Sequence, residues 1–131
     1  MSTEAPRADT ASAIAPIGTA LLVDDEELVR TSTADMLVQL GYDVIEAPSA
    51  EDALTIIQSG RRIDLLVTDH LMAGISGAEL ARILRDLRPD LPILIVSGYA
   101  EVAEMAPDVP RLAKPFRQAD LAASVAALAL A

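Results

Sequence analysis

The sequence predicts an α/β fold, a doubly wound five-stranded parallel sheet with helices on both faces, and three observations carry this prediction. From Thr19 onward, short apolar runs alternate with amphipathic stretches of period 3.6, as in successive βα units. The 131 residues give room for one domain, whereas an eight-stranded barrel needs about twice the length of this region. Hydrophobic residues make up 52% of the chain but only three are aromatic, so the expected core is aliphatic.

Five apolar runs are the predicted strands, and a tail precedes them. Residues 1–18 are rich in Ala, Ser, Thr and Pro and lack apolar periodicity, so we predict a disordered tail there and one folded domain over 19–131. The strands are expected at 20–23, 42–46, 64–68, 93–96 and 109–113.

The stretches between the strands are the predicted helices. A helix over 26–40 ends at Gly41, and serines at 49 and 76 begin the next two helices, because each precedes an acid by three residues as in a capping box. Two prolines limit a fourth helix to 100–106 at most, and a last helix covers 117–130. The residues predicted to face the core from these helices are Val29, Thr33, Met36, Leu37, Leu40, Leu80, Ile83, Leu84, Leu87, Leu121, Val125 and Leu128.

The charge and the missing residue types exclude several functions. Twenty acidic against ten basic residues give a net charge of −10, which repels nucleic acids and anionic membrane surfaces. Without cysteine and with one histidine, the chain holds no disulfide and no Cys/His zinc site. The longest uncharged stretch, 10–23, is too short to span a bilayer, and the N-terminus lacks the features of a signal peptide, so we expect a cytoplasmic protein.

Polar residues follow four of the five predicted strands. Asp24 and Asp25 follow the first strand, Asp69 the third, Ser97 the fourth and Lys114, the only lysine of the chain, the fifth. Taken alone, the acids at 24–27 are also what a helix N-terminus uses to bind free N–H groups. Because ligands of such sheets bind outside the carboxyl ends of the strands, we expect these side chains to share one site.

The chemistry of that edge points to phosphoryl transfer. Clustered carboxylates need a cation, and oxygen ligands suit Mg²⁺. With Mg²⁺, an ammonium group and a hydroxyl around it, a carboxylate can attack phosphorus while the phosphoryl oxygens are neutralised. The sequence therefore predicts an aspartyl phosphate.

Four motifs in order resemble the receiver domain of bacterial two-component response regulators, from about Thr19 to Leu130. They are LLVDD at 21–25, VTDHLMAGISG at 67–77, VSGYA at 96–100 and LAKPF at 112–116. The resemblance implies a flavodoxin-like sheet of strand order 2-1-3-4-5, a single-domain protein like the chemotaxis regulators, and Mg²⁺ as the cofactor, with Mn²⁺ as a substitute.

The resemblance also assigns roles to individual residues. Asp69 would accept the phosphoryl group from the histidine of a partner kinase. The metal would be bound directly by Asp25, through water by Asp24, and by Asp69 and the backbone carbonyl of Leu71. Ser97 and Lys114 would bind the phosphoryl oxygens.

The chain departs from the family pattern in three places. Ala73 stands where a proline usually follows the methionine, which removes no ligand but makes the loop less rigid. Arg111 takes the place of an aromatic switch residue. Ser97 and Lys114 are only 17 residues apart, which shortens the fourth helix.

Three other residues near the motifs have more open roles. Tyr99 and Phe116, with Arg111, are candidates for a switch or partner surface. The alternative for Tyr99 is simple packing on the fourth helix. His70 is expected to be a solvated neighbour of Asp69.

The leading hypothesis is a phosphorylation-dependent signalling switch rather than an enzyme. The only reactions expected of the chain itself are Mg²⁺-dependent self-phosphorylation from small phosphodonors and slow self-dephosphorylation. Its partners would be a sensor histidine kinase or a histidine phosphotransfer protein and an unknown downstream protein, reached by contact or phosphorelay without a DNA-binding output domain. A homodimer through the region from the fourth strand to the last helix is a further expectation.

Four alternatives remain at this point. In the first alternative the chain would be the receiver portion of a hybrid histidine kinase. In the second it would be a receiver-like scaffold that is never phosphorylated. An aspartyl-phosphate phosphatase is disfavoured, because Leu71 stands where such enzymes need a second acid. A flavin-binding module is disfavoured, because acids replace the phosphate loop after the first strand.

Overall fold

A computed structural model describes residues 16–98 and 110–130. Five strands and four helices are present in these two ranges. In chain order they are β1 (Gly18–Val23), α2 (Glu27–Gln39), β2 (Tyr42–Ala47), α3 (Ala50–Gln58), β3 (Leu65–Asp69), α4 (Gly77–Leu87), β4 (Ile93–Ser97), β5 (Arg111–Ala113) and α5 (Gln118–Leu130). Residues 1–15 of the tail predicted over 1–18 and the predicted helix over 100–106 lie outside the described residues.

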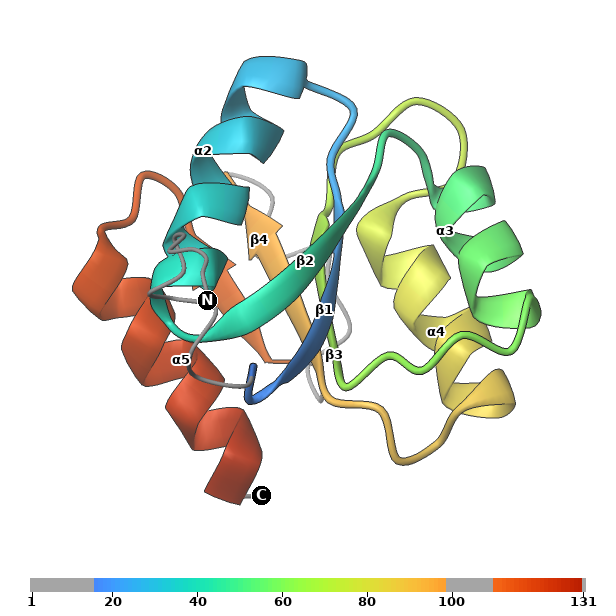
Figure 1. The fold of residues 1–131 in the computed structure, drawn as a ribbon. Coiled ribbons are helices and arrows are strands. Elements are labelled where there is room, and N and C mark those ends of the chain that lie inside the picture. The colour runs from blue at the N-terminus through green and yellow to red at the C-terminus, as the bar shows by residue number, and fades with distance from the viewer. Residues whose placement is uncertain (1–15, 99–109, 131) are drawn as a thin grey trace, which may run out of the picture.

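The strands form one parallel sheet in the order β2-β1-β3-β4-β5, which confirms the predicted fold class and strand order. Helices α2 and α5 cover one face of the sheet, and α3 and α4 cover the other (Figure 1). All strands run in the same direction, so their carboxyl ends meet at a single edge of the sheet.

Two aliphatic cores hold the three layers together. Alternate residues of one strand face opposite layers, so that Leu21 and Val23 of β1 pack toward α3 and α4, whereas Ala20 and Leu22 pack toward α2 and α5. The central strands β3 and β4 are buried along their whole length. This double burial explains why their sequences are almost continuously apolar.

The predicted helix starts agree with the structure. The Ser49 hydroxyl accepts a hydrogen bond from the N–H of Asp52, and the Ser76 hydroxyl accepts one from the N–H of Glu79. Each serine is the N-cap of its helix. Helix α2 ends just before Gly41, as predicted.

The prediction that Leu87 is buried was wrong, because its side chain is 48% exposed. The buried face of α4 is centred on Gly77, Ala81 and Leu84, where small residues let the helix approach the sheet. Leu87 lies in the last turn, at the margin of that face.

Two strand boundaries differ slightly from the predicted ones. β1 begins at Gly18, inside the predicted tail, and β5 begins at Arg111.

Asp64 connects the starts of β1 and β3 at the amino end of the sheet. Its carboxylate accepts a hydrogen bond from the N–H of Thr19 at 2.8 Å and one from Arg62 Nε at 3.1 Å. The Thr19 hydrogen bond, and then Arg62, hold the pKa of the Asp64 carboxyl below its usual value of 3.8 against the opposing effect of burial.

We expect this depressed pKa to make part of the stability depend on pH. The ionised carboxylate stabilises the folded state fully above the unfolded-state pKa, and this contribution is lost as the pH falls through the lower folded-state pKa. Asp64→Asn keeps an oxygen for Thr19 but removes the charge. Urea unfolding is measured from neutral pH down to about pH 3. Wild type should be more stable than Asp64→Asn at neutral pH, and the difference between their free energies of unfolding should narrow below about pH 4. A gap that does not change with pH would contradict this account.

No helix in the described ranges is long and apolar enough to cross a membrane.

Candidate functional site

Three carboxylates meet at the carboxyl edge of the sheet. Asp24 directly follows β1, and Asp69 is the last residue of the neighbouring strand β3. One carboxylate oxygen from each of Asp24, Asp25 and Asp69 lies within 4.8 Å of the others. Asp24 and Asp69 are 5% and 6% exposed, whereas Asp25 is exposed. The structure thus brings together three acids that the sequence places up to 45 residues apart.

Lys114 places a positive charge against this cluster. Its Nζ lies 2.8 Å from Asp69 Oδ1, and its own N–H donates to the carbonyl of Ser97 at 2.8 Å. It follows directly after β5, and the peptide bond from Lys114 to Pro115 is cis. The backbone hydrogen bond to β4 therefore holds the base of this side chain at the site.

Ser97 contributes a buried hydroxyl. It is the last residue of β4 and is fully buried, and β4 pairs with β3 such that Asp69 lies opposite Val96. Within the described ranges the Ser97 hydroxyl has no hydrogen-bond partner. An unsatisfied buried hydroxyl costs free energy, so a ligand oxygen that reached it would gain a hydrogen bond.

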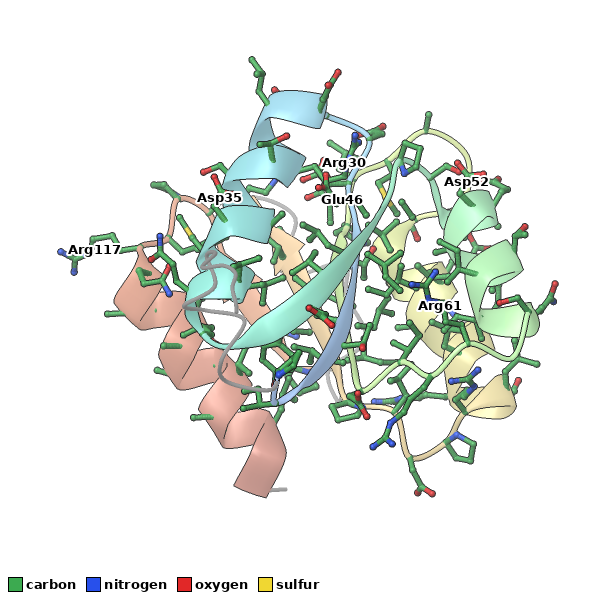
Figure 2. All side chains as sticks on the ribbon, viewed as in Figure 1. Arg30, Asp35, Glu46, Asp52, Arg61 and Arg117 are labelled. Atoms are coloured by element: carbon green, nitrogen blue, oxygen red, sulfur yellow. The ribbon has the colours of Figure 1, made fainter. Side chains whose placement is uncertain are left out.

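Arg30 anchors the backbone of the acidic pair, a role that could not be predicted from the sequence alone. Its Nη1 donates to the carbonyl of Asp24 at 2.8 Å, and its Nε lies 3.0 Å from Glu46 Oε1 on β2. Figure 2 shows Arg30 and Glu46 side by side. The Asp24 carboxylate in turn accepts from the N–H of Glu26 at 2.9 Å, an Asx turn that begins the approach to α2. An acidic residue on the neighbouring strand could have indicated this role of Arg30, but only once the pairing of the strands is known.

The prediction that His70 is solvated was wrong, because it is 6% exposed. Its backbone N–H donates to the carbonyl of Val96, and its backbone carbonyl accepts from the N–H of Gly77, both at 2.9 Å. These hydrogen bonds hold His70 at the end of the sheet. A Cβ at Gly77 would lie 2.3 Å from the carbonyl oxygen of Asp69. Position 77 therefore requires glycine, because α4 begins directly against the backbone of the central aspartate.

The other predicted site residues take different places. The Leu71 side chain is 67% exposed in the loop after β3. Phe116 is partly buried against the core beneath α2 and α5, and Arg111 is exposed on the edge strand β5. Tyr99 lies outside the described residues.

The acidic cluster fits a magnesium ion. Carboxylate oxygens are the ligands this ion prefers, and the cluster combines buried with accessible groups. Asp24 and Asp25 each have one oxygen engaged by a backbone N–H, from Glu26 and Ala73 respectively. Such hydrogen bonds orient ligating carboxylates at metal sites.

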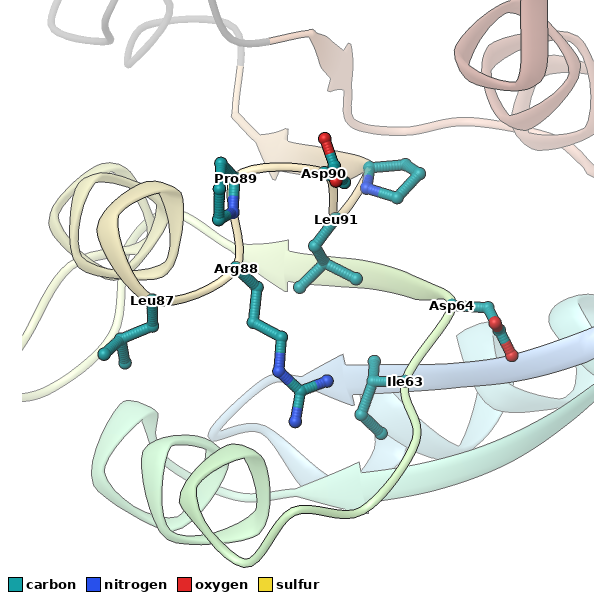
Figure 3. Close-up of a pocket in the computed structure, with 8 residues that line it drawn as sticks. Ile63, Asp64, Leu87, Arg88, Pro89, Asp90 and Leu91 are labelled. Atoms are coloured by element: carbon teal, nitrogen blue, oxygen red, sulfur yellow. The ribbon is translucent and has the colours of Figure 1, made fainter.

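A hollow at the opposite end of the sheet does not belong to this site. It lies between the segment before β3 and the turn after α4, around Arg88 and Leu91 (Figure 3). The Arg88 guanidinium donates to the carbonyls of Ile57 and Arg61 at 3.0 and 3.1 Å, near the end of α3. Arg88 therefore has a structural role in joining the end of α3 to the end of α4.

The family described as response regulator receiver domain matches residues 20–126. The sensor kinase CckA of Brucella abortus is 37% identical over 126 residues, which is 91% of this chain but 13% of that protein. The chain also spans about half the length of several curated response regulators that it matches.

Two solved structures extend the comparison. A response regulator receiver protein from Sinorhizobium medicae is 32% identical with a TM-score of 0.78, covering 91% of this chain and 98% of that one. The response regulator TrrA from Thermotoga maritima, solved in complex with Mg²⁺ and BeF, is 30% identical with a TM-score of 0.75, covering 86% of this chain and 99% of that one.

Proposed function

Because this chain belongs to the response regulator receiver domain family of two-component signalling, we propose that it is a switch that accepts a phosphoryl group on Asp69 from a histidine of a partner protein. The observation that carries this proposal is the position of Asp69. Its carboxylate lies beside two further acids and 2.8 Å from Lys114. Receiver domains are phosphoacceptors rather than enzymes of the usual kind, so one modified side chain is the product.

The transfer forms an O–P bond at Asp69 and breaks a P–N bond of the donor. A carboxylate oxygen of Asp69 attacks the phosphorus of a phosphohistidine, the P–N bond breaks, and the imidazole nitrogen leaves with the electron pair and takes up a proton. The negative charge that stays at the site is then the charge that the phosphoryl oxygens carried on the donor. The ammonium group of Lys114 would pair with one phosphoryl oxygen, and the Ser97 hydroxyl would donate a hydrogen bond to another.

Mg²⁺ is the cofactor we propose for this step, with Mn²⁺ as a substitute. Asp25, Asp69 and the carbonyl of Leu71 would hold it directly and Asp24 through water. When bound, the ion neutralises phosphoryl oxygens as they approach three carboxylates. The same residues would support self-phosphorylation from small phosphodonors and slow hydrolysis of the acyl phosphate.

An apolar groove beside Lys114 is the surface we propose for the phosphohistidine protein. It is lined by residues of α2 and of the segment after β5, among them Leu28, Met36 and Phe116. Leu28 is 82% exposed. Because Lys114 belongs both to this groove and to the site, a protein seated here can bring its histidine to Asp69.

We expect Leu28→Ser to separate docking from chemistry. The variant should be phosphorylated by acetyl phosphate at the wild-type rate, because the Leu28 side chain is 82% exposed and has no group that could bind a metal or a phosphoryl oxygen. Transfer from autophosphorylated sensor kinases of the same genome should slow on the order of 10-fold, since an exposed apolar side chain at an interface contributes about 1–2 kcal/mol. Equal transfer rates for variant and wild type would place the docking surface elsewhere.

We propose a cytoplasmic receiver that passes its signal by contact or phosphorelay to a downstream protein. The observation that supports the alternative, the receiver portion of a hybrid kinase, is the similarity to a segment of the sensor kinase CckA. A homodimer through β4 to α5 stays a prediction.

The test of the function is the intact mass of the protein after incubation with acetyl phosphate. With Mg²⁺ we expect a gain of one phosphoryl group, and with a chelator no gain. A protein that binds Mg²⁺ yet never gains the group from acetyl phosphate or from a kinase would be a receiver-like scaffold.

A further inference from the structure

A backbone hydrogen bond connects the loop after β3 to the acidic pair after β1. The N–H of Ala73 donates to Asp25 Oδ2 at 3.1 Å, across 48 residues of sequence. Both residues are exposed. In the ranges that the structure describes, this is the hydrogen bond that holds the Asp25 carboxylate, whereas the Asp24 carboxylate is held within its own turn by Glu26.

The loop that presents this N–H is fixed on both sides. Met72, one residue earlier, is 8% exposed and packs in the core beneath α3 and α4. Gly74, one residue later, has φ of +81°, and a Cβ there would lie 3.1 Å from Glu51 Oε2 on α3. Since the chain must pass between a buried methionine and α3, the Ala73 N–H is directed at the site before any ligand binds.

An exposed aspartate is otherwise free to change rotamer. Fixing its side chain costs conformational entropy, which a metal would have to overcome on binding. A hydrogen bond to one carboxylate oxygen removes that freedom in advance and leaves the other oxygen for a ligand. At metal sites, the partners that orient the ligands in this way influence the affinity strongly.

We propose that the backbone N–H of Ala73 is a positioning group for the metal, which holds Asp25 in the orientation that binds Mg²⁺. This inference rests on the proposed function, because it takes Asp25 as a ligand. It assigns a role to the main chain of a residue whose side chain contributes nothing, and only a residue other than proline can fill that role.

Ala73→Pro removes the N–H and keeps a small, exposed side chain, and Ala73→Ser retains the N–H. The Kd for Mg²⁺ is measured by calorimetry with magnesium chloride alone. We expect Ala73→Pro to bind on the order of 10-fold more weakly than wild type, and Ala73→Ser to bind with a Kd close to the wild-type value. A wild-type Kd in Ala73→Pro would overturn the inference, and so would tighter binding, which would mean that the N–H competes with the metal.

A second measurement does not depend on the proline variant. In metal-free wild type, hydrogen exchange of the Ala73 amide should be slowed, and in Asp25→Ala it should approach the rate of an open loop. Equal exchange in the two proteins would show that the contact does not form, which would also overturn the inference. Failure of the proposed function is distinguishable, because wild type would then gain no phosphoryl group from acetyl phosphate even where the Ala73 amide is slowed and Mg²⁺ binds.

Discussion

The Asp69→Asn variant should gain no phosphoryl group from acetyl phosphate and Mg²⁺, whereas wild type gains one. Asparagine has the size of aspartate but its amide is neutral and does not attack phosphorus, so the loss should be complete rather than partial. Because Lys114 Nζ lies 2.8 Å from Asp69 Oδ1, the substitution also removes the ion pair that orients the attacking group. Intact mass spectrometry at several incubation times measures the result.

The matched control is Asp90→Asn. Asp90 is an exposed aspartate in the turn after α4, at the opposite end of the sheet from the acidic cluster. This variant should be phosphorylated like wild type, which shows that removing one negative charge is not sufficient to abolish the reaction. Full labelling of Asp69→Asn would rule out Asp69 as the acceptor.

The second large effect concerns the metal. Asp25→Asn should make the metal-free protein more stable and abolish its response to Mg²⁺. The three carboxylates lie within 4.8 Å of one another only in the folded state, so their repulsion opposes folding and is relieved either by a cation or by removing one charge. At 100 times its Kd, Mg²⁺ should stabilise wild type by about 2.7 kcal/mol, or roughly 10 °C in Tm.

Thermal unfolding with and without Mg²⁺ measures both effects. The asparagine side chain still offers an oxygen to the Ala73 N–H, so the loop after β3 should keep its position. If Asp25→Asn showed the same Mg²⁺-induced shift as wild type, Asp25 would not be a ligand.

The sequence was sufficient to predict the sheet because local signals and the long-range fold agree. The segments 65–67 and 93–96 are apolar on both faces because both faces of the sheet are covered. The serines at 49 and 76 mark helix starts through hydrogen bonds between residues that are only three positions apart. Once the strands are parallel, the polar residues that follow them must share one edge, and the structure places Asp69 and Lys114 in contact there.

The features that could not be predicted depend on contacts between distant segments. His70 follows Asp69 in a loop-like sequence, yet α4 begins against it and buries it, because Gly77 lacks a side chain. The hydrogen bonds of Arg30 to the Asp24 carbonyl and of Ala73 to Asp25 follow from the paths of two loops. No periodicity or spacing in the sequence encodes these contacts.

Reduction of the phosphorylated protein with borohydride tests the central claim most directly, because this reagent converts an acyl phosphate to an alcohol and leaves a free carboxylate unchanged. After incubation with acetyl phosphate and Mg²⁺, followed by reduction and proteolysis, peptide mass spectrometry should find homoserine at position 69 and aspartate at positions 24 and 25. Homoserine at another position, or an unmodified position 69 in protein whose intact mass shows the phosphoryl group, would contradict the account.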